Sequence, residues 1–412
     1  MGGVFRNINK YIICLAPLWP NIFDIVLSAL GISYAGSESS PIFVLTSAIV
    51  FIVVVANYLF SLYKSPAIHL EELCFFFTIA VFFLLYMIVG ERFWGYPLVL
   101  LARMRRSFIY ASICVLSLYT VQRERWLETT NKMFALFAVV ATVVIAYCMF
   151  PQIVIPWWAI VYYGTLDYQS MAYLCCYVIA LLLIFFQSTK KKIYKLVCIV
   201  GIVANLVPMF LSGGRGGVAC LAISVAFIAV TSLRDLTIKK ALTMAAIVIA
   251  TAAVALLLSN RFPLIKEFFS GEMRTFNYIQ DDGISLDNRT DLYAEAVDLI
   301  KTSPILGYGI GASYYYLGIY PHNLFMEWMI DGGIPYTLFL SAIMIYRLWQ
   351  WFKCYLAHPQ IRMIMIIIVI NLANLMVSGT YYNNPWFWLL LFFDARRFFT
   401  GTMSVENKSI RL

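Results

Sequence analysis

The chain has 412 residues, of which 62% are hydrophobic and only 12% are charged, and its mean hydropathy is +0.82. A soluble domain carries roughly 25% charged and about 45–50% apolar residues, so this composition excludes a soluble globular protein. The formal net charge of +9 would suit a nucleic-acid partner in a soluble protein, but membrane proteins concentrate lysine and arginine on their cytoplasmic loops. We therefore predict an integral membrane protein without a nucleic-acid partner.

Apolar stretches of helical length follow one another along the chain. A hydrocarbon core about 30 Å thick needs about 20 apolar residues in helical form, and these stretches are continuous rather than alternating. The pattern predicts an all-α bundle of about twelve spans in a single membrane domain covering 1–412. The predicted spans are 11–32, 42–62, 73–90, 106–121, 132–150, 169–187, 195–211, 216–231, 241–258, 333–350, 363–379 and 384–399.

Lysine and arginine are distributed unevenly between the two predicted sides. If the N-terminus is cytoplasmic, 20 of the 30 basic residues fall on cytoplasmic segments, and the positive-inside rule then places both termini in the cytoplasm. The large loop at 259–331, between predicted spans nine and ten, is then external. The ten external basic residues are Arg92, Arg103, Arg105, Arg106, Arg215, Arg261, Lys266, Arg274, Arg289 and Lys301.

Arginines on the external side run against the charge bias and need a reason. For Arg103, Arg105 and Arg106 the reason is either binding to lipid headgroups or a span that begins later than predicted, and no further role is assigned. Arg261 and Arg274 lie in the external loop. We interpret these two as candidates for binding an anionic substrate at the membrane surface.

The turn at 211–217, Leu-Ser-Gly-Gly-Arg-Gly-Gly, joins two predicted spans. Its four glycines free the backbone for close approach and expose N–H groups at the start of the next helix, where anions are favoured. The guanidinium of Arg215 stays charged at physiological pH and can bind phosphate through two hydrogen bonds. A tight hairpin whose arginine reaches the membrane interface has the same pattern, so both interpretations stand.

Arg289 stands at the start of a predicted helix that runs to Lys301 and ends before Pro304 and the glycines that follow it. An arginine at a helix N-terminus opposes the helix dipole, so we expect Arg289 to have an anionic partner elsewhere. The apolar face of this helix is typical of ordinary packing as well as of a substrate-facing helix. That face consists of Leu292, Ala296, Leu299 and Ile300.

The sequence predicts neither a metal site nor a cofactor. The glycines at 307, 309 and 311 resemble a phosphate-binding loop only loosely, because no Lys-Ser/Thr follows and no strand–helix unit is available. Asp281 and Asp282 lack the spacing of a metal-binding carboxylate pair. None of the nine cysteines falls between 259 and 331, which argues against a cysteine metal site there.

The motif Tyr-Pro-His-Asn at 320–323 contains the one histidine on the predicted external side, since the other two fall in predicted cytoplasmic loops. An imidazole can take a proton from a hydroxyl group near neutral pH. Glu327, about one helical turn further on, is a candidate for orienting His322 or positioning the substrate, and Asn323 is a second candidate contact. A lone histidine is more often structural, so that alternative stays open.

Taken in order, these motifs resemble the bacterial O-antigen polymerases (Wzy-type) and O-antigen ligases (WaaL-type). The resemblance covers residues 195–350 in detail and elsewhere only the number of spans. The matching motifs are the Ser-Gly-Gly-Arg-Gly turn at 212–216, Arg289 with its helix, the glycine run after Pro304, and Pro321-His322-Asn323 with Glu327 and Gly333.

The resemblance implies a metal-independent membrane glycosyltransferase of the GT-C type at the periplasmic face of the bacterial inner membrane. It implies a glycan on undecaprenyl diphosphate as donor and a lipid-linked glycan as acceptor, with a chain-length regulator protein as a candidate partner. Arg215 and Arg289 carry over as candidates for binding the donor diphosphate. His322 carries over as the base that activates the acceptor hydroxyl.

Three activities fit these motifs. Ligases of the family tend to show a second glycine three residues after the one matched by Gly333, where this chain has Tyr336. The sequence Tyr-Pro-His-Asn-Leu-Phe-Met-Glu is closer to that of the polymerases. We therefore favour a polymerase over a ligase that transfers the glycan to lipid A–core. A flippase for lipid-linked glycans is the non-enzymatic alternative, but it would tend to show internal repeats and charges within the membrane.

Overall fold

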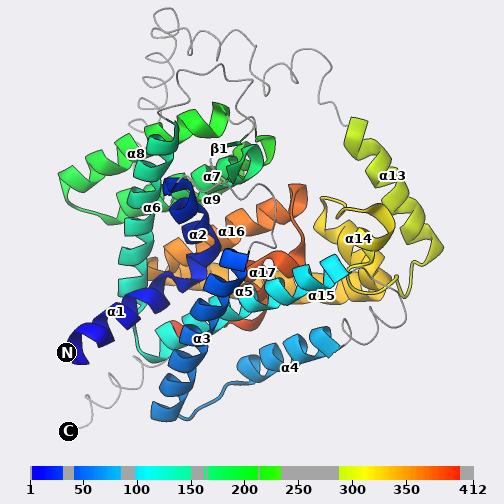
Figure 1. Ribbon diagram of the computed structural model, residues 1–412, viewed down its shortest axis with the longest axis horizontal. Coiled ribbons are helices and arrows are strands. Elements are labelled where there is room, and N and C mark those ends of the chain that lie inside the picture. Colours follow the sequence, from blue (N-terminus) through cyan, green and yellow to red (C-terminus); the bar gives the residue numbers. More distant parts are fainter. Residues whose placement is uncertain are drawn as a thin grey trace, which may run out of the picture. The chain divides into compact units, whose positions relative to one another are not determined.

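The computed structural model describes residues 2–30, 41–84, 98–149, 162–163, 166–211, 214–232 and 287–399 (Figure 1). They belong to two compact units. Unit 1 falls within Met1–Phe23, Tyr34–Phe137 and Arg289–Leu412, and unit 2 within Asp24–Ser33 and Ala138–Asn288. The single membrane domain that the sequence suggests takes both units together and stays a prediction.

The described secondary structure is helical apart from one short hairpin, which confirms the all-α class. In the hairpin, β1 (Tyr162–Tyr163) pairs antiparallel with β2 (Leu166–Asp167). The helices up to residue 232 are α1 (Gly2–Leu15), η1 (Ala16–Leu18), α2 (Trp19–Ala29), α3 (Pro41–Lys64), α4 (Leu70–Leu84), α5 (Leu98–Arg123), α6 (Leu127–Met149), α7 (Tyr168–Ser188), α8 (Lys192–Leu211) and α9 (Arg215–Ser232). Those that follow are α13 (Asp287–Thr302), α14 (Ala312–Leu317), α15 (Leu324–Ala357), η6 (Pro359–Ile361), α16 (Arg362–Val377), η7 (Tyr381–Asn383), α17 (Pro385–Phe392) and η8 (Ala395–Phe398).

Seven helical segments among the described residues are long and apolar enough to cross a membrane, judged by length and composition. Each of them overlaps a predicted span. They are Ile8–Leu27, Val44–Lys64, Leu127–Cys148, Gln169–Ser188, Lys192–Met209, Leu324–Ala357 and Pro359–Val377. Because the predicted span 241–258 lies outside the described residues, the count of about twelve spans and the GT-C-like topology stay predictions.

The last predicted span, 384–399, is wrong. α17 has eight residues and is therefore about 12 Å long, too short to cross a hydrocarbon core of about 30 Å. The helix ends because Phe393 is extended, with φ −116° and ψ 123°. Asp394 then accepts a hydrogen bond from the Arg396 N–H at 3.0 Å and begins the short turn η8.

α5 is the helix of unit 1 against which the end of the chain packs. It contacts α3, α17 and η7, and its Ser107 hydroxyl donates a hydrogen bond to the side chain of Asn383. The buried ring of Trp388 on α17 meets Phe108 of α5 edge-on, with 6.3 Å between the ring centroids. Such aromatic pairs contribute about 0.5–1.5 kcal/mol beyond their buried area. The segment that precedes and contains α17 is thereby fixed in unit 1.

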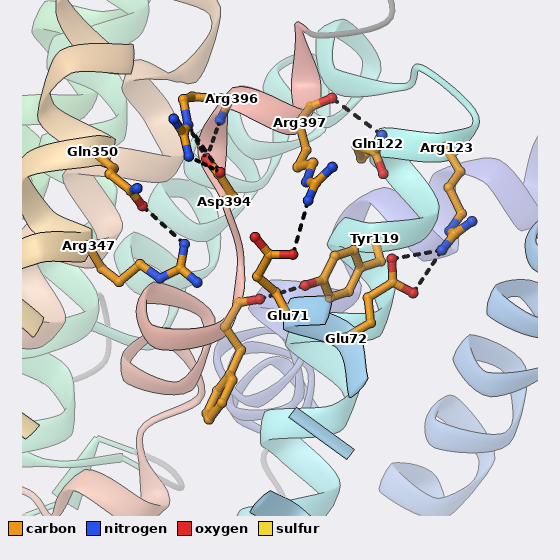
Figure 2. Close-up of polar contacts among 11 residues, drawn as sticks. Glu71, Glu72, Tyr119, Gln122, Arg123, Arg347, Gln350, Asp394, Arg396 and Arg397 are labelled. Carbon is orange, nitrogen blue, oxygen red and sulfur yellow. Dashed lines mark hydrogen bonds and ion pairs between the residues drawn. The ribbon is translucent and has the colours of Figure 1, made fainter. Parts of the chain in front are cut away.

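A network of charged side chains joins α4, α5 and η8 (Figure 2). Arg123 donates to both carboxylate oxygens of Glu72 at 2.7 Å, and Arg397 forms an ion pair with Glu71 at 3.1 Å. A buried ion pair needs such hydrogen bonds to offset the cost of desolvation. Figure 2 also shows Arg347, from the C-terminal half of α15, so this network lies toward the end of α15 that is remote from His322.

Candidate functional site

His322 lies in the short connection that leads into α15. Its φ is +53°, a left-handed conformation that few residues other than glycine adopt and that costs about 1–3 kcal/mol. The ring of Tyr320 packs edge-on against the half-buried imidazole, with 4.5 Å between the ring centroids and 62° between the planes. Backbone and neighbouring ring together hold the imidazole in place, as a directional proton transfer requires.

Asn323 is the N-cap of α15. Its side-chain oxygen accepts hydrogen bonds from the backbone N–H groups of Phe325 at 3.0 Å and Met326 at 3.2 Å. Asparagine is preferred at this position because it satisfies donors that the first helical turn leaves without partners. α15 therefore begins at Leu324, well before the predicted start of the span at 333. The contact of Asn323 with substrate stays a prediction.

Two acidic side chains, Glu327 and Asp331, are buried one helical turn apart on α15. They are 1% and 3% exposed, and residues four apart share one face of a helix. The Thr380 hydroxyl and the Tyr381 N–H (3.4 Å) donate to Glu327, while the Tyr381 hydroxyl (2.7 Å) and the Gly311 N–H (3.2 Å) donate to Asp331. Neutral donors from two other segments thus hold the acid pair.

Sequence reasoning missed Tyr381, which contacts both acids. Its hydroxyl also lies 3.3 Å from the hydroxyl of Tyr336. Burial, reinforced by the negative charge of Asp331, raises the pKa of Tyr381 well above its usual value, so the hydroxyl keeps its proton and acts as a donor. One signal was available: 378–384 is a polar and aromatic stretch that follows predicted span eleven and therefore falls on the predicted external side, as His322 does.

The glycine run after Pro304 exchanges backbone hydrogen bonds with a kink in α15. Gly333 is non-helical, with φ +71° and ψ −169°, and Pro335 has no N–H to donate to the carbonyl of Asp331. Within α15 the carbonyls of Ile330 and Asp331 would accept from residues 334 and 335. They accept instead from the N–H groups of Tyr308 and Gly309, both at 2.8 Å, while the N–H of residue 334 donates to the carbonyl of residue 304 at 2.8 Å.

Two glycines allow this close approach. Gly307 has φ +62°, and a Cβ atom there would lie 2.6 Å from the nitrogen of Gly332. At Gly333 a Cβ atom would lie 2.8 Å from the carbonyl oxygen of Pro304 and would also collide with Ile305. Left-handed φ values and contacts this short both require glycine. The motif that only loosely resembles a phosphate-binding loop is therefore a structural clamp on α15.

Asp331 accepts hydrogen bonds from two segments, and removing its carboxylate tests how much this side chain stabilises the arrangement around the clamp. Asp331→Ala is expected to lower the free energy of unfolding by about 2–4 kcal/mol, because it leaves the buried donors of Gly311 and Tyr381 without an acceptor. Asp331→Asn is the matched control, since its amide oxygen accepts from Gly311 and its NH₂ group donates to the tyrosine hydroxyl. Denaturant titration of the purified protein in detergent measures both. An Asp331→Ala variant as stable as the unaltered protein would contradict the supporting role of the Asp331 carboxylate.

The helix that carries Arg289 packs beside the same clamp. The predicted helix is confirmed as α13, and Ala296 on its predicted apolar face is fully buried in one cluster with Ala312 and Ile330. The Tyr308 hydroxyl donates to the carbonyl of Leu299 at 3.2 Å. Arg289 lies two turns before Ala296, so its backbone is about 10 Å along the helix axis from this contact. The clamp therefore connects α13 with the His322 end of α15.

In unit 2, Arg215 is the first residue of α9. Gly214 precedes it, and the carbonyl of Gly214 accepts from the N–H of Gly217 at 3.0 Å. A Cβ atom on Gly217 would lie 2.6 Å from the Cβ of Ala172, so the start of α9 can approach α7 this closely only with glycine. Both the close approach and the helix start at this turn are as the sequence predicts.

The structure brings part of the predicted site together. His322, Glu327 and the helix with Arg289 share unit 1, whereas Arg215 belongs to unit 2. For the two arginines the structure describes the backbone only, and Arg261 and Arg274 lie outside the described residues. The roles predicted for all of these side chains stay predictions.

A model of the family described as O-antigen ligase matches residues 200–341. This match supports the resemblance to the O-antigen polymerase and ligase superfamily. The matched stretch begins in α8 and ends in α15, and so includes the turn at Arg215, α13, the glycine clamp and His322. No curated protein matches the chain.

This similarity agrees with the apolar helices. The matching family is described as O-antigen ligase, and the seven candidate spans among the described residues suit a multi-pass membrane protein. The segment with Thr380 and Tyr381 lies outside the matched stretch. The family match therefore does not include the contacts of Thr380 and Tyr381 with the acid pair.

Proposed function

We propose that the chain polymerises oligosaccharide repeat units at the periplasmic face of the inner membrane, using a glycan on undecaprenyl diphosphate as donor. The observation that carries this proposal is the packing of α13, which bears Arg289, against the end of α15 that begins beside His322. The clamp therefore connects the helix that carries Arg289, the proposed cation for the diphosphate, with the helix that begins beside His322, the proposed base. The glycine-rich motif at Arg215 predicts a second cation for the diphosphate.

The proposed reaction is a direct glycosyl transfer. His322 takes the proton from the acceptor hydroxyl, whose oxygen attacks the anomeric carbon of the donor sugar. The bond between that carbon and the diphosphate oxygen breaks, and the electron pair leaves with undecaprenyl diphosphate. Arginines stabilise the negative charge that develops on the departing diphosphate, a role that fixed cations can perform without a metal ion.

The polymerase is favoured over the ligase by the sequence around His322 and by Tyr336. Ligases of the family tend to have glycine at the position of Tyr336. Here its hydroxyl lies 3.3 Å from that of Tyr381, so the side chain links α15 to the segment that binds the acid pair. A glycine at 336 would remove this link. The family description as O-antigen ligase keeps transfer to lipid A–core as the second candidate.

Deleting the gene and separating the cell's lipopolysaccharide on a gel tests the proposal. Loss of a polymerase leaves lipid A–core that carries a single repeat unit, because units are still made and ligated but not joined. Loss of a ligase leaves bare lipid A–core while lipid-linked polymer accumulates. Purified protein is expected to extend lipid-linked repeat units in the presence of EDTA. Unchanged lipopolysaccharide after deletion, or a strict metal requirement, would contradict the proposal.

A further inference from the structure

A row of four rings leads away from the proposed base. The centroid of Tyr320 lies 4.5 Å from His322, that of Tyr314 lies 5.8 Å from Tyr320, and that of Tyr382 lies 6.3 Å from Tyr314. These rings come from α14, from the connection before α15 and from η7. The rings of Tyr314, Tyr320 and His322 are half-buried, whereas Tyr382 is fully buried. The row is therefore open to a ligand along part of its length.

One polar atom beside Tyr314 has unused hydrogen-bonding capacity. In the part of the chain that the structure describes, the hydroxyl of Ser313, which precedes Tyr314, has no hydrogen-bond partner. Ser313 is fully buried. Most buried polar side-chain atoms do have a partner, so such groups call for an explanation. Hydroxyl groups of a ligand seated on Tyr314 would supply one.

We propose that this row is a subsite for the terminal sugar of the acceptor glycan. The inference rests on the proposed glycosyl transfer. A pyranose ring exposes C–H bonds on its faces and hydroxyl groups around its edge, so its faces pack on aromatic rings while its hydroxyls bond to tyrosine hydroxyls. Since the row ends at His322, a sugar that packs on Tyr314 and Tyr320 presents a hydroxyl to the imidazole.

Tyrosines also gather where a protein meets the membrane surface. α14 carries two exposed tyrosines of this kind and one that is more enclosed. Tyr315 and Tyr316 are 47% and 48% exposed and pack edge-on against each other, 5.0 Å between the centroids. This exposure suits the interfacial belt of aromatic residues that borders a membrane. Tyr314 is less exposed and its ring lies near those of Tyr320 and Tyr382. That enclosed arrangement favours a small polar ligand over lipid headgroups.

Binding of a free oligosaccharide tests the subsite without any transfer step. The probe is the oligosaccharide that mild acid releases from the lipid-linked repeat units of a gene-deletion strain, because it keeps the acceptor sugar and lacks the diphosphate. Calorimetric titration into the purified protein in lipid nanodiscs is expected to show binding. Tyr314→Ala and Tyr320→Ala are expected to weaken it at least about 10-fold, through loss of ring contacts and of a hydroxyl.

Two further variants separate sugar binding from packing. Tyr314→Phe keeps the ring and is expected to weaken binding about 2- to 12-fold, the effect of one hydrogen bond. Tyr346→Ala removes a tyrosine that is 58% exposed in the C-terminal half of α15 and is expected to leave binding unchanged. Wild-type affinity in Tyr314→Ala and Tyr320→Ala, or no binding by the unaltered protein, would overturn the subsite.

The subsite and the proposed function fail in different ways. His322→Ala removes the ring at the end of the row and is expected to weaken binding of the free oligosaccharide by no more than about 12-fold, the effect of one hydrogen bond, while it lowers turnover by about 10²–10⁴. If the protein extends lipid-linked units but does not bind the free oligosaccharide, the subsite is wrong and the polymerase stands. If binding depends on Tyr314 but no extension occurs with lipid-linked units, the polymerase is wrong and the subsite stands.

Discussion

Arg289→Ala and Arg215→Ala are each expected to lower the rate of chain extension at least about 100-fold while leaving the protein in the membrane. Each variant removes a fixed cation that stabilises charge on the departing diphosphate, and losing one such group costs about 10²–10³ in rate. Extension is measured with purified protein and lipid-linked repeat units, as the length distribution of the product on a gel.

Lys301 offers a matched control on the helix that carries Arg289. It is exposed at the far end of α13 and forms an ion pair with Asp298 at 3.1 Å, so Lys301→Ala removes a cation that has no assigned part in donor binding. We expect this variant to extend chains normally. Arg289→Lys keeps the charge but loses the bidentate hydrogen bonding, so we expect a loss of extension rate between those of Lys301→Ala and Arg289→Ala. Normal long-chain product from Arg289→Ala or Arg215→Ala would remove the diphosphate role of that arginine.

His322→Ala is expected to lower the turnover number by about 10²–10⁴ and to leave donor binding almost unchanged. The imidazole is proposed to take the acceptor proton during the chemical step, so its loss affects the step rather than the binding that precedes it. Turnover at saturating substrate and the donor dissociation constant are measured on the same preparation.

His358 provides the control for removal of an imidazole. Its ring stacks on Phe399 with 3.7 Å between the centroids and lies just after the C-terminal end of α15. His358→Ala is therefore expected to retain turnover. An unchanged turnover number in His322→Ala would exclude it as the base. A loss of donor binding equal to the loss of turnover would point to a structural role instead.

The acid pair gives the site a support that is separate from its chemistry. Glu327 and Asp331 join α15 to the glycine run on one side and to Thr380 and Tyr381 on the other. Buried polar groups that are fully hydrogen-bonded fix one arrangement of the elements that they connect. In the sequence Glu327 is a candidate for orienting His322, whereas the structure shows its carboxylate bound to Thr380 and Tyr381.

Local patterns in the sequence were sufficient for much of the fold. The length of the apolar stretches located the seven candidate spans among the described helices. A membrane-spanning helix requires about 20 apolar residues regardless of which helices pack beside it. The sequence also predicts the helix at Arg289, its apolar face and its end before Pro304, because helical period and helix termination are local properties. The span predicted at 384–399 failed because composition alone does not reveal that Phe393 is extended.

By itself the sequence determined the membrane class, the helical segments and the order of Arg215, Arg289 and His322, because these depend on composition, periodicity and motif spacing. Only the tertiary structure decided that Tyr381 binds both buried acids, that the glycine run clamps α15, and that Tyr314 and Tyr382 lie in a row with His322. The physical reason is distance along the chain. Residues 20 or more positions apart, such as Gly311 and Asp331, meet only when helices and connections pack, and no local pattern records which of them will be neighbours.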